Sequence, residues 1–376
     1  MKYNTALPYF EREDIQEILT EFQLLLEGKG LLSMGRHVQR FEREFAEWVG
    51  TDFAVATNSC TGGLETLLAA TGIGPGDEVI VPCQTFIGTA SAPARLGATP
   101  VFAEVDENYL LDIADTLERI TTKTRAVILV HFAGLIHPRL GTLRSELRTR
   151  GIALYEDAAH AHGAYHRGVM AGALADGACF SFYSTKNMTT GEGGMITTSD
   201  PELARRCASI RSRGLDTSAE YEVFTNLGTN QRLTEVQALM GLMQLKRLEE
   251  SVKHRNEIAS VYRKELEPAI KQGIISLRSS LPEDRHAYWR FVVVLGPEKS
   301  REAIARAMGM ESVKVDWPYQ PLVHLQPIMR QLYGYSDGDL PRSEHLTAKH
   351  ICLPMHRSIT KEDSKFIAKK LLENLR

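Results

Sequence analysis

The sequence predicts an α/β fold, with a seven-stranded, mainly parallel sheet wrapped by helices and a smaller α+β domain at the C-terminal end. Two observations carry this prediction. Seven short apolar runs lie between residues 53 and 198, and most are continuous rather than alternating, as in strands buried on both faces. Segments of helical length separate most of these runs, which is the pattern of βαβ units.

The expected elements follow in chain order. Two amphipathic helices, at residues 13–27 and 37–48, precede the first strand, and Phe41 and Phe45 share one face of the second helix. The seven strands are expected at residues 53–57, 78–82, 100–105, 126–132, 152–156, 177–182 and 194–198. A long helix then begins near Arg232, where Thr234 and Gln237 have the form of a capping box.

The last third of the chain predicts a second, smaller domain. Charged residues become frequent from Lys246 to Arg263, and we place the domain boundary there. Residues 1–245 are expected to form a large cofactor-binding domain and residues 246–376 a small C-terminal domain. Within the small domain we expect strands at residues 288–295 and 313–316 and a closing helix over residues 361–375.

Composition excludes several classes of protein. A net charge of -3 gives no excess of basic residues for binding nucleic acid. The five cysteines are scattered and form no CxxC, so a disulfide framework or a Cys-rich zinc site is not expected. The N-terminus lacks the apolar core of a signal peptide, and the longest apolar stretch is too short to cross a bilayer. We expect a cytoplasmic protein with no membrane partner.

Four expected strands are followed by residues that suit a ligand, and ligands bind outside the carboxyl ends of parallel strands. After the strand at 53–57 comes Asn58-Ser59-Cys60-Thr61-Gly62-Gly63 and then a helical pattern. Small residues at a helix N-terminus let backbone N–H groups approach a phosphate. An ordinary strand-to-helix turn is the alternative interpretation.

The second group is Asp157, which follows the strand at 152–156. A carboxylate here can pair with a protonated pyridine nitrogen, and that ion pair keeps the ring able to accept electrons. Capping of the next helix explains Asp157 equally well. The third group is Phe86, which follows the strand at 78–82 and could lie flat against a pyridine ring, although a core role is the more common fate of a phenylalanine.

The fourth group is Lys186, which stands between a buried strand and the glycine-rich turn Gly191-Glu192-Gly193-Gly194. Most lysines lie on solvated faces, but a partly buried lysine has a depressed pKa, and the neutral amine forms an imine with an aldehyde. Such a lysine can also move a proton during the reaction. Ser181 lies at the end of the same strand and could bind phosphate. Together, this order of groups predicts a pyridoxal 5'-phosphate (PLP) site.

These motifs resemble those of the DegT/StrS aminotransferases, also called sugar-nucleotide aminotransferases, of the fold type I, aspartate aminotransferase-like class. The resemblance covers nearly the whole chain. It rests on the segments at residues 41–46, 82–89, 97–101, 156–164, 181–187 and 190–194, and on Gly228-Thr229-Asn230-Gln231-Arg232-Leu233-Thr234-Glu235.

The resemblance implies a role for each matching position. It makes Lys186 the lysine that holds PLP as a Schiff base, Asp157 the partner of the pyridine nitrogen, and Phe86 the stacking aromatic. Thr61, Gly62 and Ser181 match phosphate-binding residues. Asn230 matches a residue that reaches the phosphate from the neighbouring subunit, which implies a homodimer with shared active sites. His324 matches a segment that binds substrate across the dimer.

Two positions depart from the family pattern. His160 stands where the family often has glutamine, beside the cofactor hydroxyl, and we expect it to contact the cofactor. Cys60 stands where the first phosphate turn usually has glycine, and cysteine lacks glycine's conformational freedom. The sequence also contains a His-rich segment with His160, His162 and His166, a residue type that can bind zinc. Because the PLP interpretation already explains His160, no metal is expected.

The favoured function is transfer of an amino group from L-glutamate, or glutamine, to a keto-sugar that is nucleotide-linked, in amino-sugar biosynthesis. Three alternatives stay open. The acceptor could be a cyclitol or another non-nucleotide ketone. The protein could be a PLP-dependent sugar dehydratase, although dehydratase relatives commonly replace the lysine with histidine. It could also be a PLP-binding regulator without turnover.

Overall fold

The computed structural model describes residues 1–216, 220–278 and 280–375. Its centre is a seven-stranded sheet in the order β1-β9-β8-β5-β4-β2-β3. The strands are β1 (Phe53–Thr57), β2 (Glu78–Pro82), β3 (Thr99–Ala103), β4 (Thr124–Val130), β5 (Ala153–Asp157), β8 (Gly177–Ser181) and β9 (Gly194–Thr198). Only β9 runs antiparallel to its neighbours, so the predicted α/β fold class and the mainly parallel sheet are confirmed.

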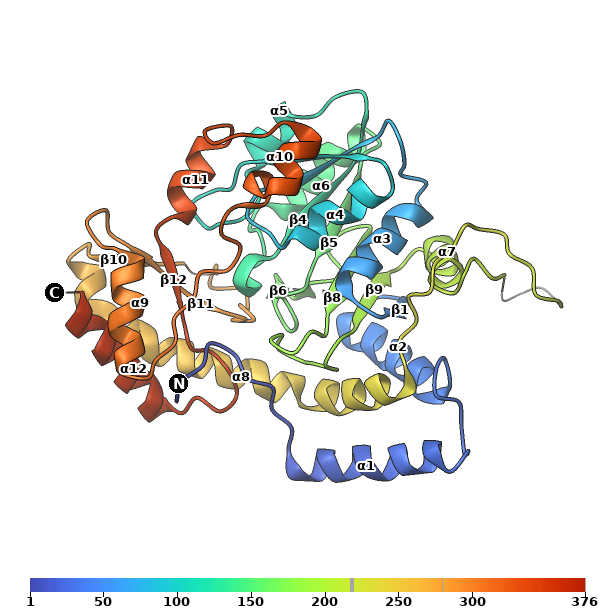
Figure 1. Cartoon of the computed structure of the whole chain (residues 1–376), viewed down its shortest axis with the longest axis horizontal. Helices are drawn as coiled ribbons and strands as arrows, with labels where there is room; N and C mark the ends of the chain where they lie inside the picture. The colour runs from blue at the N-terminus through green and yellow to red at the C-terminus, as the bar shows by residue number, and fades with distance from the viewer. Residues whose placement is uncertain (217–219, 279, 376) are drawn as a thin grey trace.

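Helices cover this sheet on both faces (Figure 1). They are α2 (Arg36–Val49), α3 (Cys60–Ala70), α4 (Ile87–Arg95), α5 (Ile113–Glu118), α6 (Leu140–Thr149) and α7 (Pro201–Arg211), with the short helix η1 (Phe132–Gly134) and the hairpin β6 (Tyr165–His166) and β7 (Val169–Met170) between them. As expected, Phe41 and Phe45 share a buried face of α2, and they contact the rings of Phe180 and Phe182 at the end of β8.

A second sheet, in the order β10-β11-β12, lies in the C-terminal part. Its strands are β10 (Ile275–Leu277), β11 (Phe291–Leu295) and β12 (His350–Leu353), and the helices around it are α9 (Arg301–Met310), η2 (Val323–Leu325), α10 (Pro327–Tyr333), α11 (Pro341–Thr347) and α12 (Lys361–Asn374). The strand expected at 313–316 does not form, because Val313 bridges to Tyr3 whereas Asp316 bridges to Cys352, so no continuous ladder exists.

Helix α8 (Glu235–Lys271) runs beneath both sheets (Figure 1). It begins with the expected capping box between Thr234 and Gln237. The predicted boundary at residues 245 and 246 falls inside this continuous helix, and the division into two domains stays a prediction. Helix α1 (Arg12–Leu26) lies below α8 and contacts it through the ion pair of Asp14 with Arg247. Among the described residues, no helix is long and apolar enough to cross a membrane.

Candidate active site

A cavity of about 480 Å³ opens at the carboxyl ends of the parallel strands. Strands β1, β2, β4, β5 and β8 all end at this edge, because β1 and β8 both pair antiparallel with β9. Six of the residues singled out from the sequence line it: Thr61, Phe86, Asp157, His160, Ser181 and Lys186. The cavity volume lies in the range typical of small-molecule sites.

The N-terminus of α3 forms one end of the cavity. The Ser59 hydroxyl caps the helix by accepting a hydrogen bond from the Gly62 N–H at 3.0 Å. Cys60 begins the helix with ordinary backbone geometry, so the departure from glycine at this position requires no left-handed conformation. A side chain at Gly194 would lie within 2.6 Å of the Ser59 and Cys60 backbone, which explains why glycine begins β9 here.

Asp157 is the last residue of β5 and is buried against the cavity wall. Its Oδ2 accepts a hydrogen bond from the Thr89 hydroxyl at 2.7 Å, and its Oδ1 accepts one from the Ala159 N–H at 3.1 Å. The Cys60 sulfur lies 3.9 Å from Oδ1. Burial, and then the charge of Asp157, hold the pKa of the Cys60 thiol well above its usual range, so this neighbour stays uncharged.

Lys186 follows β8 by five residues and is partly buried, with its Nζ 4.4 Å from the centre of the Trp289 ring. Burial lowers the pKa of this amine to about 8, and Arg290 adds to the effect, whereas Asp157 and Cys60 oppose it. A lysine in this state has a substantial neutral fraction near pH 8, and the neutral amine is the nucleophile toward an aldehyde.

His160 contacts two aromatic residues that sequence reasoning missed. Trp289 stacks on it with ring centroids 3.6 Å apart and an interplanar angle of 8°, and the Tyr319 hydroxyl hydrogen-bonds its Nε2 at 2.7 Å. Burial, with Lys186 and Arg290 nearby, holds the pKa of His160 well below its usual value. The imidazole is therefore neutral, and its buried Nδ1 has no protein partner.

Phe86 and Ser181 line the cavity from two different elements. Phe86 precedes α4 and is 55% exposed, so its ring is available to a ligand rather than packed in the core. Ser181, the last residue of β8, is buried, and its hydroxyl accepts a hydrogen bond from the Tyr183 N–H at 3.3 Å.

Three sequence-derived residues do not line the cavity of their own chain. The Gly62 N–H is engaged by Ser59, and a side chain at Gly62 would collide with the Gln231 amide. Asn230 is exposed on the segment between α7 and α8, where its Oδ1 accepts a hydrogen bond from Arg232 Nε at 3.0 Å.

His324 is fully buried and hydrogen-bonds Glu344 at 3.2 Å. The ring of His324 therefore has no exposed surface to offer a substrate in this arrangement, and its substrate role stays a prediction.

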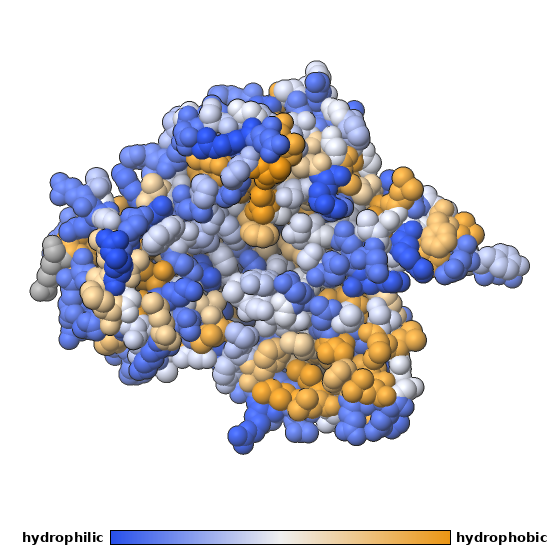
Figure 2. All heavy atoms as spheres, viewed as in Figure 1, coloured by the Kyte–Doolittle hydropathy of each residue, from blue (hydrophilic) through white to orange (hydrophobic). Residues whose placement is uncertain are grey.

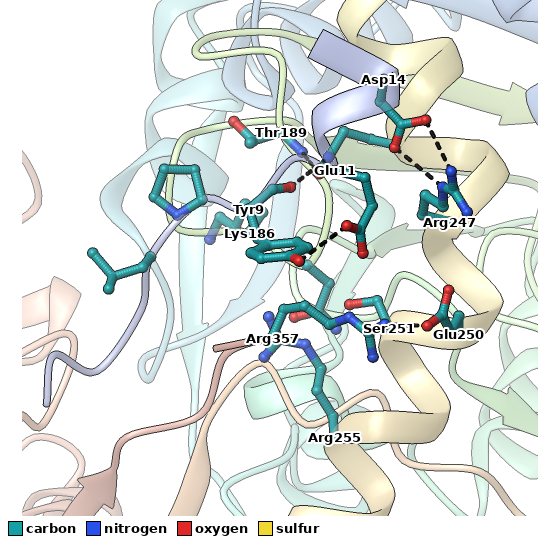
Figure 3. A pocket seen from close by; sticks show the side chains of 14 residues that line it. Tyr9, Glu11, Asp14, Lys186, Thr189, Arg247, Glu250, Ser251, Arg255 and Arg357 are labelled. Atoms are coloured by element: carbon teal, nitrogen blue, oxygen red, sulfur yellow. Dashed lines mark hydrogen bonds and ion pairs between the residues drawn. The ribbon is translucent and has the colours of Figure 1, made fainter. Parts of the chain in front are cut away.

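Lys186 also lines a second, polar pocket (Figure 3). This pocket is lined by Tyr9 and Glu11 of the N-terminal segment, by Arg247 and Arg255 of α8, and by Arg357. Its volume of about 30 Å³ is roughly that of one water molecule. The larger cavity is therefore the one that can hold a cofactor and a substrate.

The histidines of residues 160–166 do not converge on one point. His162 packs against Phe180 and Phe182, and His166 hydrogen-bonds the Asp284 carboxylate at 2.8 Å. Within the described part of the chain, no group of three His, Cys, Asp or Glu residues could hold a metal ion.

The residues present fit PLP. The cavity places a buried carboxylate for a ring nitrogen, an amine with a lowered pKa for an aldehyde, an exposed aromatic for the ring face and hydroxyls beside a helix N-terminus for a phosphate. The unpartnered Nδ1 of His160 is a further polar atom that a ligand could satisfy.

Comparison with known proteins gives one consistent answer. The family model described as DegT/DnrJ/EryC1/StrS aminotransferase matches residues 12–372. The spore coat polysaccharide biosynthesis protein SpsC of Bacillus subtilis is 36% identical, covering 95% of this chain and 93% of its own. The GDP-perosamine synthase of Caulobacter vibrioides is also 36% identical, covering 88% of each chain. Among solved structures, DesV of S. venezuelae aligns with a TM-score of 0.88 and 31% identity over 99% of both chains.

Proposed function

The chain belongs to the DegT/DnrJ/EryC1/StrS aminotransferase family, and we propose that it moves an amino group from L-glutamate, or glutamine, to a nucleotide-linked keto-sugar. The family depends on PLP, so the chain is a PLP-dependent aminotransferase. The observation that carries the proposal is the meeting of Lys186 and Asp157 in one cavity at the edge of the sheet.

Lys186 is the residue to which we assign both covalent binding and proton transfer. Its lowered pKa makes the Nζ nucleophilic near neutral pH, so it can bond to the cofactor aldehyde as a Schiff base. With PLP and an amino donor bound, the amine of Lys186 would be the base that takes the proton from the donor carbon and, once protonated, the acid that returns it to the cofactor carbon.

We assign to the other cavity residues the binding and orientation of the cofactor. PLP, when bound, withdraws electrons from the reacting carbon through its protonated ring. We assign to Asp157 the ion pair with that ring nitrogen and to Phe86 the stacking contact. Thr61 and Ser181 supply hydroxyls for the phosphate, beside the backbone donors at the start of α3. To the neutral His160, whose Nδ1 has no protein partner, we assign a contact with the ring hydroxyl.

A homodimer with shared sites is part of the proposal. Apolar side chains gather around α1 on the face shown in Figure 2, and the exposed ones in and after this helix include Ile15, Leu19, Leu26, Leu31 and Leu32. The described residues between α7 and α8 project from the body and expose Tyr221, Val223, Phe224 and Leu227 (Figure 1). Apolar surface of this kind supports contact with another protein, and the exposed Asn230 lies on the same projecting segment.

The assignment of the acceptor is supported by the relatives. One is named a spore coat polysaccharide biosynthesis protein, and another is named for a GDP-linked amino sugar. A cavity of about 480 Å³ has room for more than the cofactor alone.

The test is an acceptor panel with the PLP-loaded protein and L-glutamate, in which release of 2-oxoglutarate is measured. The panel contains a nucleotide-linked keto-sugar, the same keto-sugar without its nucleotide, and a cyclitol ketone. We expect sustained release only with the nucleotide-linked acceptor. Turnover with the cyclitol alone would support the non-nucleotide alternative. Loss of water from the sugar without 2-oxoglutarate would indicate a dehydratase, and no reaction with any amino donor would indicate a binding protein.

A further inference from the structure

The Asp157 carboxylate is held by a chain of two threonine hydroxyls. Thr89 Oγ1 lies 2.7 Å from Asp157 Oδ2, and Thr85 Oγ1 lies 2.7 Å from Thr89 Oγ1. Both threonines are buried, and both line the cavity. The function described above uses the carboxylate but assigns nothing to these two hydroxyls.

The direction of this chain follows from hydrogen-bonding chemistry. A carboxylate oxygen accepts hydrogen bonds, so the Thr89 hydroxyl must donate its single proton to Asp157. Thr89 can then only accept from Thr85, and the Thr85 hydroxyl must donate. Each hydroxyl therefore has one orientation, and the chain ends on Oδ2 of Asp157.

The same short turn carries the aromatic expected to cover the ring. Phe86 is the residue before α4, and its carbonyl accepts a hydrogen bond from the Thr89 N–H at 3.1 Å. Thr85 and Thr89 thus lie on either side of Phe86 in the chain. The turn that presents an aromatic face to the cavity also fixes the carboxylate at the end of β5.

We propose that Thr89, oriented by Thr85, is a positioning residue that holds the Asp157 carboxylate toward the ring nitrogen of PLP. The inference rests on the proposed function and deepens it. Thr89 fixes Oδ2 from one side, while the Ala159 N–H fixes Oδ1 from the backbone. Rotation of the carboxylate would break one of these bonds, so together they hold it in one orientation at the cavity wall.

The experiment compares Thr89→Val, which removes the hydroxyl at nearly constant volume, with Thr89→Ser, which keeps it. The matched control is Thr66→Val, because Thr66 is equally buried on α3 but its hydroxyl has no protein partner. For each variant, the dissociation constant of PLP is measured by titrating the apoprotein, and kcat and KM for L-glutamate are measured on the loaded enzyme. Thermal unfolding of the apoprotein checks the fold.

We expect Thr89→Val to weaken PLP binding roughly tenfold to a hundredfold, the range of a hydrogen bond to a charged group. Its kcat should fall while KM for L-glutamate changes little, and Thr89→Ser should restore most of both losses. Thr66→Val should match the wild type. Thr85→Val should act in the same direction but more weakly, and it provides the test should Thr89→Val fail to fold.

A Thr89→Val protein that folds, binds PLP as tightly as the wild type and keeps its kcat would overturn the inference. So would an equal loss in Thr89→Ser, because the hydroxyl would then not be the active feature. If the wild type itself fails to bind PLP, the proposed function fails instead, so the two failures are distinguishable.

Discussion

The indole of Trp289 lies flat on the imidazole of His160, with centroids 3.6 Å apart. The same indole donates a hydrogen bond from its Nε1 to the Thr185 carbonyl at 2.9 Å. Trp289 comes from the segment just before β11, whereas His160 and Thr185 follow strands of the central sheet. One side chain from the C-terminal part therefore contacts both the cofactor cavity and the residue next to Lys186.

Truncation of Trp289 should affect both stability and reaction. Trp289→Ala should lower the free energy of unfolding by about 3–5 kcal/mol, the cost of emptying a large buried site, and should slow the reaction with L-glutamate. Trp289→Phe keeps a ring over His160 but loses the bond to Thr185, so the loss should be smaller. Denaturant unfolding and stopped-flow kinetics measure the two effects. Trp48→Phe, on α2, serves as the control for Trp289→Phe. A Trp289→Ala protein with an unchanged free energy of unfolding and an unchanged rate with L-glutamate would contradict the role of Trp289 in linking the C-terminal part to the cavity.

The capture of PLP should follow the ionisation of Lys186. Its pKa is lowered from 10.5 to about 8, so the neutral amine grows as pH rises toward 8 and is nearly complete above 9. The rate of visible-band formation after mixing apoprotein with PLP should rise with pH and then level off near pH 8–9. An ordinary lysine would keep gaining about tenfold per pH unit up to its pKa of about 10.5. A rate that climbs through pH 10 would contradict the lowered pKa.

Asp157→Asn should weaken cofactor binding and slow catalysis still more strongly. The amide keeps the shape of the side chain but removes the charge that pairs with the ring nitrogen. We expect PLP to bind at least as weakly as in Thr89→Val, so that Lys186 captures it fully only at saturating PLP. At saturating PLP the rate of the half-reaction with L-glutamate should fall by a factor on the order of 10² or more, as for loss of an electrostatic stabiliser. Rapid-scan absorbance follows both events in one sample. A half-reaction at the wild-type rate would exclude the ion pair as a catalytic element.

The shared-site proposal predicts complementation between two defective chains. A Lys186→Ala chain still supplies Asn230, and an Asn230→Ala chain still supplies Lys186. When the two are coexpressed, half of randomly formed dimers are hybrids with one complete site each. Activity should then recover to roughly a quarter of the wild-type value. Sedimentation of each protein alone checks that both still form dimers, and activity that never exceeds the average of the two parents would argue for sites built within one chain.

Much of the fold could be predicted because its strands are buried on both faces. Residues 53–57, 78–82 and 194–198 are strands over the full expected ranges, since continuous apolar runs between helices allow few other structures. The cavity residues from the central sheet could be predicted for a related reason. Asp157 and Ser181 end parallel strands, and Thr61 and Phe86 follow such strands within a few residues.

The missed residues have no such local pattern. Trp289 falls within the strand expected at 288–295. In the structure Tyr288 has a φ of +46° and β11 begins only at Phe291. The segment before β11 therefore turns toward the cavity instead of continuing the strand. Tyr319 lies in a loop five residues before His324, and only the packing of the C-terminal part brings it to His160. The hydroxyl of Thr89 meets Asp157 because the fold brings the first turn of α4 to the end of β5, which no spacing along the sequence reveals.

The central claim is that Lys186 is the residue that bonds to PLP, and borohydride reduction followed by peptide mass mapping tests it most directly. Reduction of the PLP-loaded protein should add the mass of the reduced cofactor to the peptide that contains Lys186, and prior treatment with L-glutamate should prevent the addition. Attachment to another lysine, or no attachment in a protein that still transaminates, would contradict the account.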